Sequence, residues 1–129
     1  MHDIRVPMFV VGTEQDHVAP WRSVLKFHFL ADADVTFVLT NGGHNAGVLS
    51  EPGHRNRHFR MALHRHGEQY VDPDTWLTMN SPQEGSWWPA WSGWLAERSG
   101  APVPPPPLGG TDGKFAPLEN APGRHVMMK

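Results

Sequence analysis

The chain has 129 residues, a formal net charge of −2 at pH 7 and no cysteine. A chain of this length forms at most one domain. The charge argues against nucleic-acid binding, and the lack of thiols excludes disulfides, cysteine-based zinc sites and a thiol nucleophile supplied by this chain. No apolar run is long enough to cross a bilayer and no signal-peptide pattern opens the chain, so we expect a cytoplasmic protein.

The first expected element is an apolar run, Val6–Gly12, which predicts a buried strand. It begins a few residues after Met1, with no preceding helix or turn to cover it. Because parallel strands normally need both faces covered, we expect this chain to be a piece of a longer domain.

A helix and a second strand follow. Pro20 suits the first turn of a helix, and the apolar spacing over residues 21–30 predicts a helix with one apolar face. That face comprises Trp21, Val24, Leu25 and His28. Val35–Thr40 is rich in β-branched residues and predicts a second buried strand. A strand–helix–strand unit of this length is by default a right-handed parallel crossover.

Each predicted strand ends in a loop with a titratable residue. Asp16 follows the first strand and His44 the second, so both are expected at the carboxyl edge of a parallel sheet, where α/β proteins build active sites. An acid followed by a histidine also matches the order of the last two members of a hydrolase triad. Alone, Asp16 would more often be a turn or capping acid and His44 a solvent-facing turn residue, but their pairing favours catalytic roles. His17 is expected to hydrogen-bond within its loop, and Asn45 to hold the histidine loop together.

The segment after His44 predicts shorter elements. Ala46–Ser50 has the composition of a short helix start, ended by the Pro-Gly pair that follows. Alternation of apolar and polar residues over residues 57–64 predicts a half-exposed strand. A turn at Gly67 would join this strand to residues 69–71 as a small hairpin.

Two helices and a tail complete the chain. The Asp-Pro-Asp of residues 72–74 predicts the start of a helix over residues 75–79. Ser86 is the predicted N-cap of a helix over residues 87–98, whose tryptophans at helical spacing favour core packing over a sugar- or polymer-binding platform. Residues 101–129 are rich in proline and glycine, which predicts an extended tail.

Four histidines close together in sequence invite a metal-binding interpretation: His54, His58, His64 and His66. The first two are four residues apart, a spacing that would put both on one face of a helix, as zinc sites require. The Pro-Gly pair before them and the alternating pattern after them oppose a helix, and neighbouring arginines would repel a cation. We therefore expect exposed histidines, with no metal and no cofactor, and keep a histidine-based metal protein as the weakest alternative.

Three blocks of sequence carry a resemblance to a known family. They are Thr13–Trp21, Gly42–Gly47 and Gly85–Trp91, which read TEQDHVAPW, GGHNAG and GSWWPAW. In this order and at this spacing they resemble the C-terminal part of the polyhydroxyalkanoate synthases, enzymes of the α/β-hydrolase superfamily that make bacterial storage polyester. The separation of Asp16 from His44, and the ending Leu118–Arg124 after a proline-rich stretch, are similar to that family as well.

The resemblance implies an α/β fold, with residues 1–100 as the C-terminal part of an α/β-hydrolase-type catalytic domain and residues 101–129 as its tail. It implies a catalytic cysteine, aspartate and histidine that polymerise 3-hydroxyacyl-coenzyme A with release of coenzyme A. In that chemistry His44 would deprotonate the cysteine thiol, and Asp16 would either orient His44 or help to activate the attacking hydroxyl. A synthase carries its cysteine in a Gly-x-Cys-x-Gly box ahead of the acid, and this chain has none. We therefore expect a fragment, or the product of a truncated or split gene, that is inactive alone.

The expected partners are 3-hydroxyacyl-coenzyme A, the polyester chain, and either the missing synthase segment or a synthase subunit, at polyester granules or elsewhere in the cytoplasm. Two alternatives remain open at this point. One is a non-catalytic protein that associates with granules or with full-length synthase, because an exposed strand edge and the tryptophan block would both recruit partners. The other is a fragment of a different α/β-hydrolase.

Overall fold

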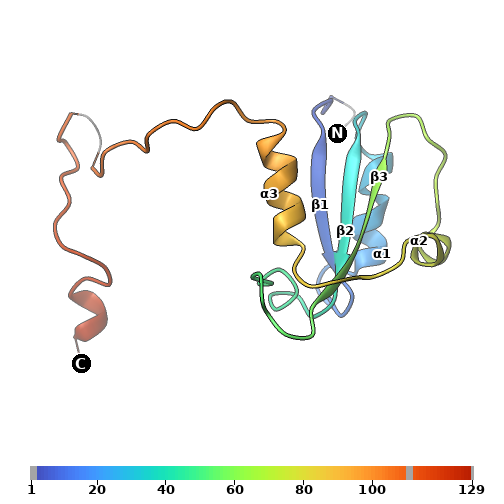
Figure 1. The fold of residues 1–129 in the computed structure, drawn as a ribbon, viewed down its shortest axis with the longest axis horizontal. Helices are drawn as coiled ribbons and strands as arrows, with labels where there is room; N and C mark the ends of the chain where they lie inside the picture. Colours follow the sequence, from blue (N-terminus) through green and yellow to red (C-terminus); the bar gives the residue numbers. More distant parts are fainter. Residues whose placement is uncertain (1–2, 110–111, 129) are drawn as a thin grey trace. The chain divides into compact units, whose positions relative to one another are not determined.

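The structure of the protein is a computed structural model that describes residues 3–109 and 112–128. Contacts between residues divide the chain into two compact units, Met1–Ser99 and Gly100–Lys129. The described residues of the first unit form a mixed α/β fold with one four-stranded sheet in the order β1-β2-β3-β4 (Figure 1). The α/β fold class predicted from the sequence is therefore confirmed.

The two predicted strands form the parallel part of the sheet. β1 spans Met8–Thr13 and β2 spans Val35–Thr40, and they pair in parallel from Met8 opposite Val35 to Thr13 opposite Thr40. Every residue of β2 is buried, whereas the first four residues of β1 are only half-buried because β1 lies at the edge of the sheet. Since both strands end at the same level, the loops that follow them begin side by side.

The segment between these strands differs in form from the single helix predicted over residues 21–30. It consists of a short α-helix, α1 (Trp21–Val24), continued by a 3₁₀-helix, η1 (Leu25–Phe29). Aromatic and β-branched side chains crowd the preceding turn of an α-helix, and Nδ1 of His28 lies 2.5 Å from the Leu25 carbonyl oxygen, which gives that oxygen a partner outside the α-helical pattern. The predicted apolar face is confirmed, because Trp21 and Leu25 are buried.

The antiparallel part of the sheet differs from the predicted hairpin of residues 57–64 with residues 69–71. β3 (His58–His64) pairs with β2, and its outer neighbour is the short β4 (Gln83–Glu84). Gly67 does form a turn, with a φ of 84°, but residues 69–71 form no strand and the prediction for them was wrong. Val71 packs instead on the core cluster around Trp76, so the chain leaves the sheet here in order to cover its face.

Two further helices cover the sheet. α2 (Pro73–Met79) starts where the sequence predicts, because the Asp72 carboxylate accepts hydrogen bonds from the backbone N–H groups of Asp74 and Thr75 at 3.0 and 3.1 Å. α3 (Trp88–Ala96) is slightly shorter than predicted. The predicted N-cap was wrong by one residue, because the N-cap of α3 is Trp87 and not Ser86. The Ser86 hydroxyl oxygen still accepts from the backbone N–H of Trp88 at 3.0 Å.

Both faces of the sheet are covered, with α1, η1 and α2 on one side and α3 on the other (Figure 1). The first core cluster comprises Trp21, Leu25, Phe37, Leu39 and Trp76. The second comprises Val38, Phe59 and Trp87, with Met61 packed against it. The alternation predicted for the third strand is confirmed, since Phe59 and Met61 pack on the second cluster and Ala62 on the first.

The second unit, Gly100–Lys129, has one short helix among its described residues, the 3₁₀-helix η2 (His125–Met127). Its other described residues lie in turns, bends or irregular backbone, and nearly all are exposed. Throughout residues 3–109 and 112–128, every helix is too short or too polar to span a bilayer.

Candidate functional site

The loops after β1 and β2 are joined by backbone hydrogen bonds that extend the strand pairing. The N–H of Glu14 donates to the Thr40 carbonyl at 2.9 Å, and the N–H of Gln15 donates to the Gly42 carbonyl at 3.0 Å. The N–H of Asp16 then turns back to the Thr13 carbonyl at 3.2 Å. These bonds hold the acidic loop against the histidine loop at the carboxyl edge of the parallel strands.

The Asp16 carboxylate is buried in this loop and its oxygens are occupied. Oδ1 accepts from the backbone N–H groups of Val18 at 2.9 Å and Ala19 at 2.8 Å, and the side chain is only 7% exposed. The Ala19 N–H, together with the hydrogen bond from His44, lowers the pKa of Asp16 to about 2. Asp16 is therefore a fixed negative charge at neutral pH.

The structure brings His44 onto this carboxylate. Nδ1 of His44 lies 2.9 Å from Oδ2 of Asp16, while 48% of the imidazole side chain stays exposed. A carboxylate on Nδ1 selects the tautomer that carries its proton there, which leaves Nε2 as the nitrogen able to take a proton from another group. This is the geometry of the acid–histidine half of a catalytic triad.

Glycine makes the histidine loop possible at two positions. Gly42 has a φ of 105°, which strongly favours glycine, and a Cβ there would lie 2.9 Å from the backbone nitrogen of Gly47. A Cβ on Gly47 would collide with the Cγ2 of Thr13. The loop therefore sits directly on the end of β1. The helix start predicted at Ala46–Ser50 was wrong, because these residues form turns and irregular backbone.

Of the neighbouring residues considered from the sequence, His17 is exposed and makes no hydrogen bond within the described residues, so its predicted bonding in the loop was wrong. Asn45 stabilises the histidine loop as expected, but through its carbonyl, which accepts from the N–H groups of Val48 and Leu49, both at 3.1 Å. Sequence reasoning missed Thr13, whose hydroxyl lies 3.4 Å from Oδ2 of Asp16. The only sequence signal for Thr13 is its position at the end of the strand that leads to Asp16.

The histidines considered as metal ligands are separated in the structure. Nε2 of His58 lies 3.6 Å from a carboxylate oxygen of Glu14, and Nδ1 of His64 lies 3.9 Å from one of Glu68. Nδ1 of His54 lies 2.9 Å from the Arg55 carbonyl oxygen instead. In residues 3–109 and 112–128, no three histidine, aspartate or glutamate side chains are arranged to hold a metal ion.

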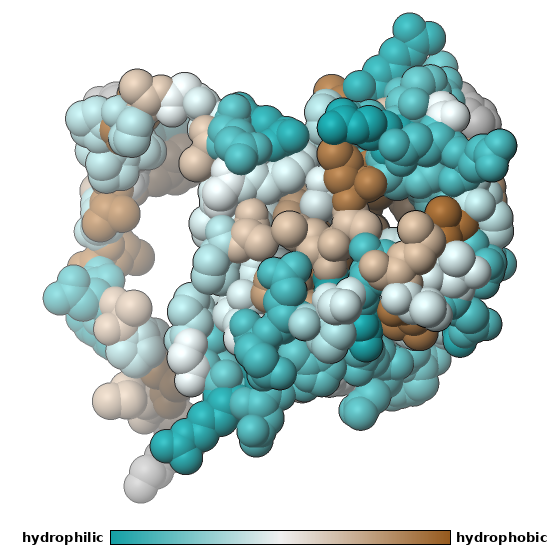
Figure 2. Space-filling view, turned by 45° about the vertical axis from the view of Figure 1, so that its right-hand side comes forward, coloured by the Kyte–Doolittle hydropathy of each residue, from teal (hydrophilic) through white to brown (hydrophobic). Residues whose placement is uncertain are grey.

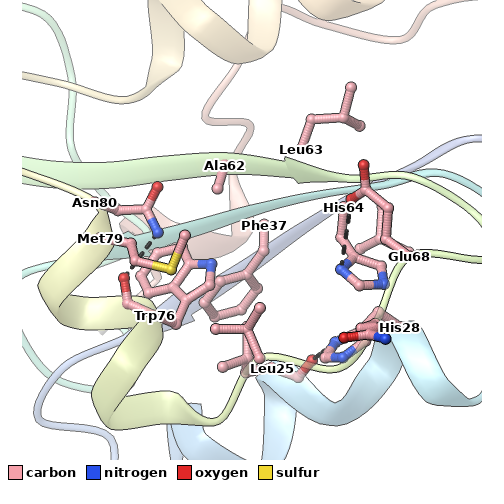
Figure 3. Close-up of a pocket in the computed structure, with 13 residues that line it drawn as sticks. Leu25, His28, Phe37, Ala62, Leu63, His64, Glu68, Trp76, Met79 and Asn80 are labelled. Carbon is pink, nitrogen blue, oxygen red and sulfur yellow. Dashed lines mark hydrogen bonds and ion pairs between the residues drawn. The ribbon is translucent and has the colours of Figure 1, made fainter.

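A cavity of about 240 Å³ lies between the sheet and α2 (Figure 3), and neither Asp16 nor His44 is among the residues that line it. Phe37, Trp76 and Met79 line its apolar part, and His64 lies at its other side. His64 is opposite Val35, the first residue of β2, so this cavity reaches the amino edge of the parallel strands and not the carboxyl edge.

Figure 2 shows a patch of apolar residues in the middle of an otherwise hydrophilic face, so apolar surface is exposed on this chain as well as buried.

The fold and the pair define the class: an α/β protein that carries a triad-like acid and histidine at the carboxyl edge of two parallel strands. Comparison with known proteins shows that this chain is similar, over nearly its whole length, to poly(3-hydroxyalkanoate) polymerases. It is 35% identical to the polymerase subunit PhaC of Rhizobium etli over 127 residues, 98% of this chain and 19% of that protein. It is 34% identical to PhaC of Cupriavidus necator and 36% identical to the polymerase of Methylorubrum extorquens, each over 98% of this chain and 20% of the relative.

These similarities confirm the resemblance predicted from the sequence. The chain spans about a fifth of the length of the curated relatives it matches. No family model matches the chain.

Proposed function

We propose that this chain supplies the acid and the histidine of a Cys-Asp-His active site in a poly(3-hydroxyalkanoate) polymerase of α/β-hydrolase fold. The main support for this proposal is the 2.9 Å hydrogen bond between His44 Nδ1 and Asp16 Oδ2, which lie in the loops that follow two parallel strands. The similarity of the chain to these polymerases supports it as well. Because this chain has no cysteine, the nucleophile comes from another stretch of polypeptide.

The proposed chemistry is acyl transfer from 3-hydroxyacyl-coenzyme A. A cysteine thiol has a pKa of about 8.5 and is mostly protonated at neutral pH. Nε2 of His44 takes the thiol proton, the sulfur attacks the thioester carbonyl, and coenzyme A leaves as a thiolate that regains the proton. The 3-hydroxyl group of another acyl unit then gives its proton to the imidazole and attacks the enzyme thioester. The ester bond forms as the carbon–sulfur bond breaks, and the cysteine leaves as a thiolate that takes the proton back from the imidazolium.

The surroundings of Asp16 favour one of its two candidate roles. Both of its carboxylate oxygens already accept hydrogen bonds, and the side chain is 7% exposed, so an incoming hydroxyl has little access to it. This supports orientation of His44 and stabilisation of the imidazolium over direct activation of the attacking hydroxyl.

Thiol release from 3-hydroxybutyryl-coenzyme A tests the proposal. The isolated chain should show no turnover, and activity should appear when it is mixed with a Cupriavidus necator polymerase that lacks the homologous region. His44→Ala should remove most of the restored activity, because a positioned base contributes about 10²–10⁴-fold. The neighbouring exposed histidine provides the control, His17→Ala, which should keep it. Turnover by the isolated chain, or an active restored enzyme with His44→Ala, would overturn the proposal.

A non-catalytic role in association is the second candidate. It is favoured by the exposed edge of β1, which pairs only with β2 among the described residues, and by the partly exposed rings of α3 such as Trp91. Co-sedimentation of the chain with polyester granules from a strain without polymerase would support this function. Recovery of the chain only in the soluble fraction would rule it out.

A further inference from the structure

The loop that carries His44 runs from Gly42 to Ser50, and the carbonyls that accept its internal backbone hydrogen bonds lie in its first half. The N–H of Gly47 donates to the Gly43 carbonyl at 2.9 Å, and Asn45 accepts two further backbone bonds. Within the described residues, no backbone N–H completes the bonding of the carbonyls from Ala46 to Ser50. The second half of the loop therefore depends on donors from elsewhere.

Side-chain donors from two distant segments reach every one of these five consecutive carbonyls. The donors and their acceptors are Arg57 Nη2 to Ala46 at 2.6 Å and Leu49 at 3.2 Å, Trp87 Nε1 to Gly47 at 3.3 Å, Trp88 Nε1 to Val48 at 3.0 Å, and Ser86 Oγ to Ser50. We call the four donor residues, Arg57, Ser86, Trp87 and Trp88, the carbonyl clamp. Figure 1 shows this loop below the sheet, beside the start of α3.

The donors of the carbonyl clamp belong to segments that adjoin the sheet and α3. Trp87 is 5% exposed and packs with Val38 and Phe59 on one face of the sheet. The Ser86 hydroxyl also accepts from the backbone N–H of Trp88, and Arg57 directly precedes β3. A loop held by such donors takes its position from the sheet and from α3.

His44 needs this support because packing does not hold its ring. Nearly half of the imidazole is exposed, and within the described residues its one hydrogen bond is to Asp16. The position of Nδ1 on the carboxylate therefore depends on where the loop backbone is. That backbone is set by the clamped carbonyls two to six residues further along the chain.

We propose that the carbonyl clamp positions His44, with Arg57 and Trp88 as positioning residues that keep the imidazole on Asp16. This inference rests on the function proposed above. It also connects the Gly85–Trp91 block directly to the site, in addition to the core packing that its tryptophan spacing predicts.

Two substitutions weaken the carbonyl clamp while keeping an aromatic ring or a positive charge at the same position. Trp88→Phe keeps an aromatic ring without the N–H, and Arg57→Lys keeps the charge but cannot reproduce the two-carbonyl contact of a guanidinium. Trp91→Phe is the matched control, since Trp91 is 41% exposed and its N–H makes no hydrogen bond within the described residues. Thermal unfolding of each full-length variant checks that it remains folded.

The readout is histidine and carboxyl NMR on the full chain. With the clamp weakened, the fraction of neutral His44 protonated at Nδ1 should fall. The pKa of Asp16 should rise from about 2 toward its ordinary value of 3.8, only in part, because the Ala19 and Val18 N–H groups stay in place. Trp91→Phe should leave both signals unchanged. Unchanged signals in folded Trp88→Phe and Arg57→Lys, or an equal change in Trp91→Phe, would overturn the proposal.

The restored enzyme described above gives a second readout. In Trp88→Phe the imidazole of His44 should be misplaced, which should lower kcat roughly 10- to 100-fold. KM should change little, because substrate binding is not altered. The NMR signals are read without turnover, so an inactive restored enzyme would count against the proposed function and leave the test of the clamp intact.

Discussion

Asp16 and His44 share a hydrogen bond but differ in their surroundings. The Asp16 carboxylate is nearly buried and accepts from two backbone N–H groups, a hydroxyl and the imidazole. The imidazole has one partner within the described residues and is about half exposed. The acid is thus the fixed member of the pair and the histidine the accessible one, which suits a base that must meet a nucleophile from another segment.

The first prediction concerns the pH dependence of stability that Asp16 causes. Its pKa is lowered on folding, so its contribution is complete above the ordinary value of 3.8 and is lost as pH falls toward about 2. Wild type should therefore be more stable than Asp16→Asn at neutral pH, and the difference should shrink between about pH 4 and pH 2. Urea unfolding of both proteins across this range measures it.

The comparison between the two proteins removes the effect of the other carboxylates, including Asp72 and Asp74, whose pKa values are also lowered. A difference in unfolding free energy that stays constant down to about pH 2 would show that the Asp16 carboxylate gains nothing on folding.

At the scale of elements, glycine decides where the histidine loop can lie. Gly47→Ala should place a methyl group against the Cβ of Thr13 at 2.8 Å, which neither β1 nor the loop can accommodate without moving. We expect a loss of about 1–3 kcal/mol of stability in urea unfolding, together with weaker Asp16–His44 pairing.

A glycine in α3 supplies the control. A methyl group added at Gly93 would meet no neighbouring atom within 4 Å, so Gly93→Ala should stabilise the helix by roughly 0.5–1 kcal/mol. Equal effects of the two substitutions would contradict the close approach of the loop to Thr13.

The N-cap of α2 gives the third prediction. Asp72→Ala removes the acceptor for the N–H groups of Asp74 and Thr75, and should cost about 1 kcal/mol in urea unfolding. Asp72→Asn keeps an acceptor oxygen and should recover most of that loss at neutral pH. If both variants lose the same stability, the negative charge of Asp72, and not its hydrogen bonds, holds the start of α2.

The elements differ in how far sequence could predict them, and the reason is the range of the interactions involved. β1 and β2 follow from short apolar runs, and their ends place Asp16 and His44 without any knowledge of the core. The 3₁₀ continuation at Leu25–Phe29 contains a side-chain contact of His28 with the Leu25 carbonyl, and the outer partner of β3 lies some twenty residues beyond it. The carbonyl clamp joins residues up to 40 positions apart, which no local pattern encodes.

At the scale of the whole molecule, β2 is the centre of the first unit. Phe37 and Leu39 belong to one core cluster and Val38 to the other, so the two cores meet across this strand. β2 is also paired on both edges, with β1 and β3, whereas β1 is paired on one edge among the described residues. Stability should therefore fall from β2 toward β1.

Amide hydrogen exchange tests this gradient in the full-length chain. The amides of β2 should exchange slowest, and only through global unfolding, because both its faces and both its edges are covered. In β1, amides that donate to β2 should be protected, while those that point to the open edge should exchange quickly. Exchange measured by NMR with residue resolution separates the two sets. Uniform protection of β1 at high protein concentration that is lost on dilution would mean that a second copy covers the edge. Uniform protection at every concentration would contradict the position of β1 at the edge of the sheet.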